Sequence, residues 1–151
     1  MSEFITILIA ASPVLELRGS IPIAIGVFGF TAQKAFLLSL LGNAIPAFFL
    51  LLFLPLFANY IAKKVVPIEK SLNWVFERTK SKHSKKVEAM GLIALFLLTA
   101  APLPLTGVWT ASILAFLFKF PFNKALPTIL LGMIVAGFLV TALVTGLIYI
   151  I

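Results

Sequence analysis

Two charged side chains lie two residues apart inside an apolar segment near the N-terminus. Glu16 and Arg18 fall within residues 12–22, and Lys34 is the only other charged residue in the whole of residues 4–62. Ionisable side chains in apolar, membrane-type segments are costly and by default indicate a functional site. The planar guanidinium of Arg is well suited to phosphate, and a buried carboxylate can carry a proton. The pair therefore predicts a site for a charged group or a proton. A purely structural ion pair is the alternative reading.

The rest of the sequence offers little other chemistry. Glu16 is the only carboxylate in the apolar blocks, so paired-carboxylate catalysis lacks its second group. The chain has no cysteine and one histidine, His83, which stands among lysines and is expected to be solvated. A glycine-rich phosphate loop before a soluble helix is also missing from the sequence. We therefore expect no enzyme, no cofactor and no metal site. Transport would be either driven by an ion gradient or passive.

Composition places the chain among membrane proteins. Of its 151 residues 62% are hydrophobic and 11% charged, with a mean hydropathy of +1.16. A soluble domain is about half apolar and about a quarter charged. The net charge of +7 comes largely from one linker between apolar blocks, which favours anionic lipid over nucleic acid as its partner. We expect one transmembrane domain over residues 1–151, in a multi-pass protein of the cell membrane.

Prolines and glycines divide two of the apolar blocks. Pro13, Gly19 and Pro22 split residues 4–30 into halves of roughly ten residues, too short to span a bilayer. This block is either one kinked spanning helix or a re-entrant hairpin, and we prefer the hairpin. Its second helix should begin between Gly19 and Pro22. The block at 90–118 is broken in the same way over residues 99–110, and its second helix should begin after Gly107. The expected segments are a re-entrant hairpin at 4–30, a spanning helix at 35–57, a basic cytoplasmic linker at 58–89, a re-entrant hairpin at 90–118 and a spanning helix at 125–151.

The two halves of the chain resemble each other. With re-entrant hairpins, ten of the twelve basic residues fall on one side, which satisfies the positive-inside rule and makes the halves inverted repeats. The predicted fold is thus an all-α integral membrane protein built as an inverted repeat of a broken re-entrant helical hairpin plus one spanning helix. The matched residues are Lys34, Ala35, Leu41 and Gly42 with Lys124, Ala125, Leu131 and Gly132, at an offset of 90, and Leu17, Gly19, Phe28 and Phe30 with Leu105, Gly107, Phe116 and Phe118, at an offset of 88.

If the two hairpin tips meet, they form one site. Two helix N-termini and Arg18 would then attract an anion, and Glu16 would neutralise Arg18 or carry the coupled proton. Trp109 either lines the cavity or packs as an ordinary core residue, and packing is the safer expectation. The predicted substrate-binding residues are Glu16, Arg18, Gly19, Ser20, Thr106, Gly107, Trp109 and Thr110.

The pattern Pro13-x-x-Glu16-Leu17-Arg18-Gly19-Ser20-Ile21-Pro22-x-Ala24, with Ala101-Pro102-Leu103-Pro104-x-Thr106-Gly107, resembles the small multidrug export protein family. That family looks like a distant relative of the DedA (SNARE-associated, VTT) superfamily. The resemblance implies facing re-entrant helices and a role such as flipping undecaprenyl phosphate or scrambling lipids. The longer DedA pattern carries a second-half arginine cluster, where this chain has Thr106.

These observations favour a transporter or flippase-like protein for an amphipathic, anionic substrate such as a lipid-linked phosphate, with proton coupling through Glu16. One alternative is an exporter of hydrophobic cations that uses Glu16, although the neighbouring Arg18 repels cations. The other is a non-transporting membrane scaffold. We expect membrane lipids as partners, a homodimer and no nucleic acid.

Overall fold

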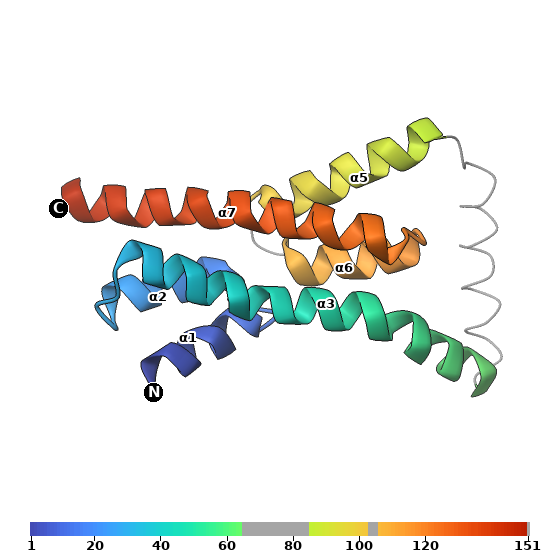
Figure 1. Cartoon of the computed structure of the whole chain (residues 1–151), viewed down its shortest axis with the longest axis horizontal. Helices are drawn as coiled ribbons and strands as arrows, with labels where there is room; N and C mark the ends of the chain where they lie inside the picture. Colours follow the sequence, from blue (N-terminus) through green and yellow to red (C-terminus); the bar gives the residue numbers. More distant parts are fainter. Residues whose placement is uncertain (65–84, 103–105, 151) are drawn as a thin grey trace.

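The computed structural model describes residues 1–64, 85–102 and 106–150, and these residues are helical apart from short connections. Two long helices, α3 (Ala32–Lys64) and α7 (Phe122–Ile150), lie side by side and run in opposite directions (Figure 1). Two hairpins of shorter helices flank them. They are α1 (Ser2–Ala11) with α2 (Glu16–Gly26), and α5 (Lys85–Ala100) with α6 (Val108–Leu117). The predicted all-α architecture is confirmed.

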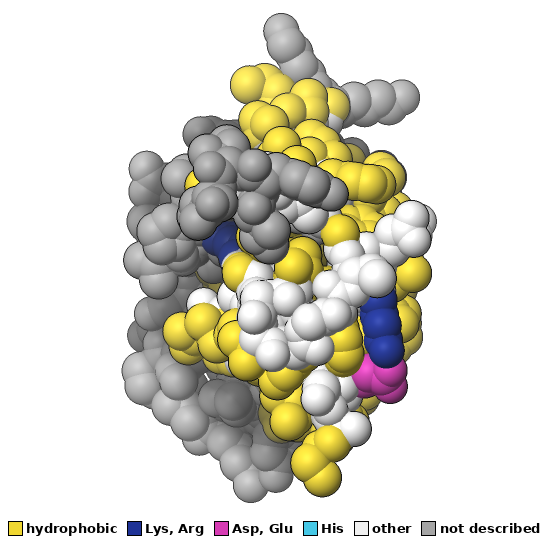
Figure 2. Space-filling view, turned by 90° about the vertical axis from the view of Figure 1, so that its left-hand side faces the viewer, with side chains coloured by type: hydrophobic (Ala, Val, Ile, Leu, Met, Phe, Trp, Pro, Cys, Tyr) yellow, Lys and Arg dark blue, Asp and Glu magenta, His cyan; other side chains and the backbone are white. Residues whose placement is uncertain are grey.

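The long helices are apolar enough to cross a membrane. Each helix contains a 26-residue candidate span, 32–57 and 122–147, whose most apolar 18-residue window has a mean hydropathy of 2.3 and 2.4, respectively. Many large apolar side chains on them are exposed, among them Phe48 on α3 and Phe138 on α7. Such a surface is unfavourable in water and suits contact with lipid chains. Figure 2 shows one end of the molecule, where the charged side chains in view are few among hydrophobic ones.

The first hairpin turns earlier than the sequence predicts. Helix α1 ends at Ala11 and α2 begins at Glu16, so the expected start between Gly19 and Pro22 is wrong. The hydroxyl of Ser12 donates to the Ile9 carbonyl at 2.7 Å and accepts from the Leu15 amide at 3.3 Å. These bonds satisfy backbone groups at the turn, and Pro13 cannot continue α1. Pro22 therefore lies inside α2 and not in its first turn.

The second hairpin breaks where the sequence places its break. Helix α5 ends at Ala100, and α6 begins at Val108 directly after Gly107. Gly107 has φ 128° and ψ −161°, a backbone conformation that is open essentially to glycine alone. Thr99 and Thr110, at the margins of the predicted break, are helical, so the break is shorter than the sequence predicts.

Each hairpin packs closely against the long helix that follows it. A Cβ built on Gly42 of α3 would lie 2.8 Å from the Cβ of Ala10 on α1. A Cβ built on Gly132 of α7 would lie 2.7 Å from the Cβ of Thr99 on α5. The absence of a side chain at these two glycines, ninety residues apart, allows the backbones to approach.

The burial pattern of the two halves corresponds over most of their length. In the shorter helices the offset is 91, not the 88 expected from sequence. It exceeds the offset of 90 in the long helices by one, because one additional residue lies between α2 and the turn that follows it. The Phe30 amide reaches back six residues to Ala24, whereas the Phe120 amide reaches back five to Ala115. The corresponding buried positions are Ala35, Ser39, Gly42, Asn43, Pro46 and Ala47 of α3 with Ala125, Ile129, Gly132, Met133, Ala136 and Gly137 of α7, and Glu16, Leu17, Ser20, Ile21 and Ala24 with Gly107, Val108, Ala111, Ser112 and Ala115.

The expected linker at 58–89 is shortened by helix at both ends, because α3 continues to Lys64 and α5 begins at Lys85. The middle of this linker, residues 65–84 with His83, lies outside the described residues.

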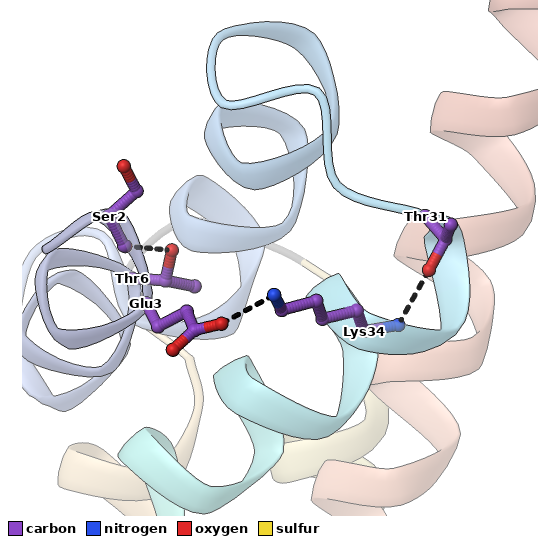
Figure 3. A network of polar contacts seen from close by, with 5 residues as sticks. All are labelled: Ser2, Glu3, Thr6, Thr31 and Lys34. Atoms are coloured by element: carbon purple, nitrogen blue, oxygen red, sulfur yellow. Dashed lines mark hydrogen bonds and ion pairs between the residues drawn. The ribbon is translucent and has the colours of Figure 1, made fainter.

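A polar cluster joins the start of α1 to the start of α3 (Figure 3). The Lys34 ammonium forms an ion pair with the Glu3 carboxylate, and it also lies 4.4 Å from the centre of the Phe30 ring. The Thr31 hydroxyl accepts from the Lys34 amide at 3.4 Å, and Thr6 donates to the Ser2 carbonyl at 2.9 Å. The first hairpin therefore starts and finishes at the same end of the molecule.

Candidate functional site

The tips of the two hairpins meet, and Glu16 lies at the junction. Its side chain is only 5% exposed, and one carboxylate oxygen accepts a hydrogen bond from the Trp109 backbone amide at 3.3 Å. Trp109 is the second residue of α6, where backbone N–H groups have no partner within the helix. The Glu16 carboxylate thus lies at the positive end of the α6 dipole, a favourable place for a negative charge.

The backbone of Glu16 is unusual in the same place. Its φ is +50°, in the left-handed region that residues with a side chain seldom adopt. Strained backbone of this kind costs of order 1 kcal/mol and persists where surrounding contacts fix it. Gly107 provides the complementary shape, because a Cβ built there would collide with the Glu16 carboxylate. The two residues occupy corresponding positions in the two halves, so only one of them can carry a side chain.

Arg18 reaches across the junction to the other broken end. Its Nη2 donates to the carbonyl oxygen of Ala101 at 3.0 Å and to the Thr106 hydroxyl oxygen at 3.0 Å. Thr106 in turn donates to the same Ala101 carbonyl at 2.9 Å. Ala101 directly follows the end of α5, where carbonyl groups carry partial negative charge. The guanidinium therefore stabilises the end of α5, while the Glu16 carboxylate stabilises the start of α6.

Trp109 connects the junction to an apolar groove. Its indole Nε1 donates to the Ala11 carbonyl at 3.2 Å, which links the start of α6 to the end of α1. The same side chain lines a groove of about 480 Å³ along α3. Pockets of a few hundred cubic ångströms are the size that binds small organic ligands. The remaining lining residues are Ala11, Ile45, Pro46, Phe49, Leu50, Phe53, Leu54 and Phe57.

The structure brings together Glu16, Arg18, Thr106, Gly107 and Trp109, five of the eight predicted site residues. The other three are Gly19, Ser20 and Thr110. Gly19 packs against Leu15 of its own turn. Ser20 faces α3, where its hydroxyl donates to that of Ser39 at 2.6 Å. Thr110 is half-buried in the first turn of α6.

Sequence reasoning missed two parts of this region. The carbonyl of Ala101 became a partner of Arg18 only through the meeting of the tips, and backbone groups leave no signal in a sequence. The aromatic groove did leave one, because Phe49, Phe53 and Phe57 recur every four residues and so share one face of α3.

The described residues contain no group of three or more His, Cys, Asp or Glu side chains that could hold a metal ion. What this junction offers is one carboxylate, one guanidinium, a threonine hydroxyl and an apolar groove beside them. These groups can bind and release a charged amphipathic molecule, and a carboxylate so placed can exchange a proton.

Comparison with known proteins gives a family for most of the chain. Residues 16–139 match the family described as "Putative small multi-drug export protein". No curated protein and no solved structure matches the chain. The matched region begins at Glu16, directly after the turn of the first hairpin, and includes Arg18, the tip of the second hairpin and most of α7. Because the match covers well over half of the sequence, the chain belongs to this small multidrug export protein family.

Proposed function

We propose that this chain is a membrane transporter that moves an amphipathic, anionic substrate, such as a lipid-linked phosphate, past the junction of its two hairpin tips. The observation that carries the proposal is the pair of contacts across the junction, Glu16 to Trp109 and Arg18 to Ala101 and Thr106. An export-protein family and two helices able to span a membrane support transport in general.

In this proposal the two halves form an inverted repeat with re-entrant hairpins in the cell membrane. Helices α1, α2 and α6 have 10, 11 and 10 residues, so each is about 15 Å long, half of a hydrocarbon core of about 30 Å. The Glu3–Lys34 ion pair supports re-entry, because the start of α1 and the start of α3 lie together. Broken helices with an interrupted backbone at the midplane are a common plan for transporters.

Arg18 is the proposed contact for the anionic group. It is positioned at the junction by neutral acceptors, the Ala101 carbonyl and the Thr106 hydroxyl, and a phosphate oxygen can replace either of them. The apolar part of the substrate would lie in the groove beside Trp109. Glu16 is the proposed proton carrier, because protonation of its carboxylate would weaken the contact with the α6 N-terminus and loosen the junction.

One specific observation favours a second candidate, the export of hydrophobic cations. The groove is lined by Phe49, Phe53, Phe57 and Trp109. The backbone amide of Trp109 also donates to the Glu16 carboxylate, so the groove extends to the carboxylate's neighbour. Aromatic faces attract organic cations, and a carboxylate would neutralise them. In this case Glu16, and not Arg18, would contact the charged group of the substrate.

The two candidates differ in the substrate that is moved and in the need for Arg18, and proteoliposomes that contain the purified chain distinguish them. For a fluorescent polyprenyl phosphate, Arg18→Ala should reduce the rate of flipping about 10- to 100-fold. This factor corresponds to the free energy of one or two lost charge-assisted hydrogen bonds. Arg18→Lys should recover part of it. For a lipophilic fluorescent cation, Glu16→Gln should abolish uptake. Lys124→Ala, at the start of α7, removes a positive charge elsewhere and is the matched control.

Retention of full anion flipping by Arg18→Ala would refute the role of Arg18. If the unaltered chain moves neither substrate although it is folded, transport itself is contradicted and a membrane scaffold becomes the better description.

A further inference from the structure

The buried amide of Asn43 has no hydrogen-bond partner in the part of the chain that the structure describes. The side chain is 1% exposed, and both its nitrogen and its oxygen lack a partner. An unsatisfied buried amide costs about 1–3 kcal/mol, and a membrane offers it no water from outside. A polar side chain that remains in such a place points to a bound molecule that satisfies it.

The packing of α2 against α3 shows what lies near Asn43. The hydroxyl groups of Ser20 and Ser39 are 2.6 Å apart, so these two residues face each other across the two helices. The helices run in opposite directions (Figure 1). One turn before Ser20 is Glu16, and one turn after Ser39 is Asn43. Residues four apart share a helix face, so this register places Asn43 at the level of Glu16.

Four buried polar side chains therefore lie at two neighbouring levels of α2 and α3, and at one of these levels Ser20 and Ser39 are in contact. Glu16 is 5% exposed, and Ser20 and Ser39 are fully buried. On α7, the corresponding buried positions are apolar, with Ile129 in place of Ser39 and Met133 in place of Asn43. At these corresponding positions only the first half is polar, although the second half has buried polar side chains elsewhere, Thr99 and Ser112.

The chemistry of the unpaired groups identifies the bound molecule. Asn43 needs both a donor for its oxygen and an acceptor for its nitrogen. A cation could satisfy only the oxygen, and an anion could satisfy only the N–H groups. Water does both, and buried waters typically make two to four hydrogen bonds to such groups. Each serine hydroxyl also has acceptor capacity beyond the Ser20–Ser39 bond.

We propose that Asn43, Ser39 and Ser20 form a closed hydration site that holds water at the level of the Glu16 carboxylate. The site does not depend on the proposed transport function, since it follows from burial and register alone. Water held there gives Glu16 a polar neighbour on the α3 side, opposite the α6 amide.

The first test is nuclear magnetic resonance of the unaltered chain in nanodiscs of deuterated lipid. With asparagine labelled by nitrogen-15, the side-chain amide of Asn43 should show a cross peak at the water frequency, although it is 1% exposed. Asn123, which is exposed, is the positive control, and the labelled methyl group of Met133, which is 2% exposed, is the dry control. Asn43→Gln assigns the signal. The absence of a water cross peak from Asn43 would overturn the site.

The second test compares Asn43→Leu with Met133→Leu. If the Asn43 amide were buried with no water and no other hydrogen-bond partner, leucine would remove an unsatisfied polar group and raise the melting temperature. With water bound, Asn43→Leu breaks its hydrogen bonds and lowers the melting temperature by several degrees, whereas Met133→Leu, a volume-conserving change, has little effect. A higher melting temperature for Asn43→Leu would contradict the proposal. If that variant does not fold, the measurement on the unaltered chain decides.

Discussion

The carboxylate of Glu16 occupies the space that a side chain at Gly107 would need. The two residues correspond in the burial patterns of the two halves, with Leu17 and Val108 buried directly after them. Only one side chain fits at this point. This steric reason explains why the first hairpin carries the carboxylate and the second carries glycine.

Gly107→Ala should therefore damage the junction more than an ordinary glycine substitution. The added Cβ would collide with Glu16, and alanine does not tolerate a φ of 128°. We expect the free energy of unfolding to fall by about 2–4 kcal/mol, from overpacking and backbone strain together. Thermal unfolding in detergent measures it.

Gly26→Ala, at the end of α2 with nothing within 4 Å of the new Cβ, is the control for the Gly107 variant. Glu16→Ala combined with Gly107→Ala should recover part of the loss, because the collision is removed. Equal melting temperatures for the Gly107 and Gly26 variants would show that the tips do not meet as described.

Gly42→Ala and Gly132→Ala should destabilise the chain by similar amounts. Each new Cβ would press on the first helix of a hairpin, on Ala10 of α1 or on Thr99 of α5. Overpacking at such close helix contacts costs about 1–3 kcal/mol. Gly146→Ala meets nothing within 4 Å, so alanine should be neutral or stabilising there. A neutral result at one of the two paired positions would contradict the equivalent packing of the halves.

The Glu3–Lys34 ion pair should give a small pH-dependent stability. The Lys34 ammonium holds the pKa of Glu3 below its ordinary value through a hydrogen bond and its charge. A lowered folded-state pKa means that the stabilisation is complete above the ordinary pKa and is lost as the pH falls through the folded-state value.

Melting temperatures of the unaltered chain and of Glu3→Gln, measured from neutral to acidic pH, check this prediction. The difference between the two should be constant at neutral pH, vanish in acid and shrink in high salt, because the pair is exposed. A difference that grows in acid would contradict the sign.

The proposed topology places Lys34 and Lys124 on opposite sides of the membrane. The chain contains no cysteine, so Lys34→Cys and Lys124→Cys each introduce a single reactive site at an exposed position. A membrane-impermeant maleimide applied to intact cells should label one variant and reach the other only after permeabilisation. Labelling of both from outside would refute the re-entrant arrangement, and the unaltered chain gives the background.

Several features of the chain could be predicted from its residues. The apolar blocks and their proline and glycine breaks predicted an all-helical architecture with two long apolar helices, and α3 and α7 have this character. The start of α6 after Gly107 also followed from sequence. The start of α2 did not, because Pro22 is tolerated inside the helix and the turn is instead closed by the hydroxyl of Ser12. A local side-chain bond of this kind competes with helix and cannot be ranked without its geometry.

The sequence by itself determined that one carboxylate and one guanidinium stand alone in an apolar segment, because hydropathy and charge are properties of residue type. The tertiary structure alone decided what those charges touch. Glu16 binds the start of α6 and Arg18 binds the carbonyl that follows α5, contacts that span 93 and 83 residues. These two partners are backbone groups, which every residue carries, whereas the Thr106 hydroxyl is a side-chain partner of Arg18. Which backbone groups become the partners of Glu16 and Arg18 therefore depends on which helix end the packing brings to the junction. Residue type alone does not predict this.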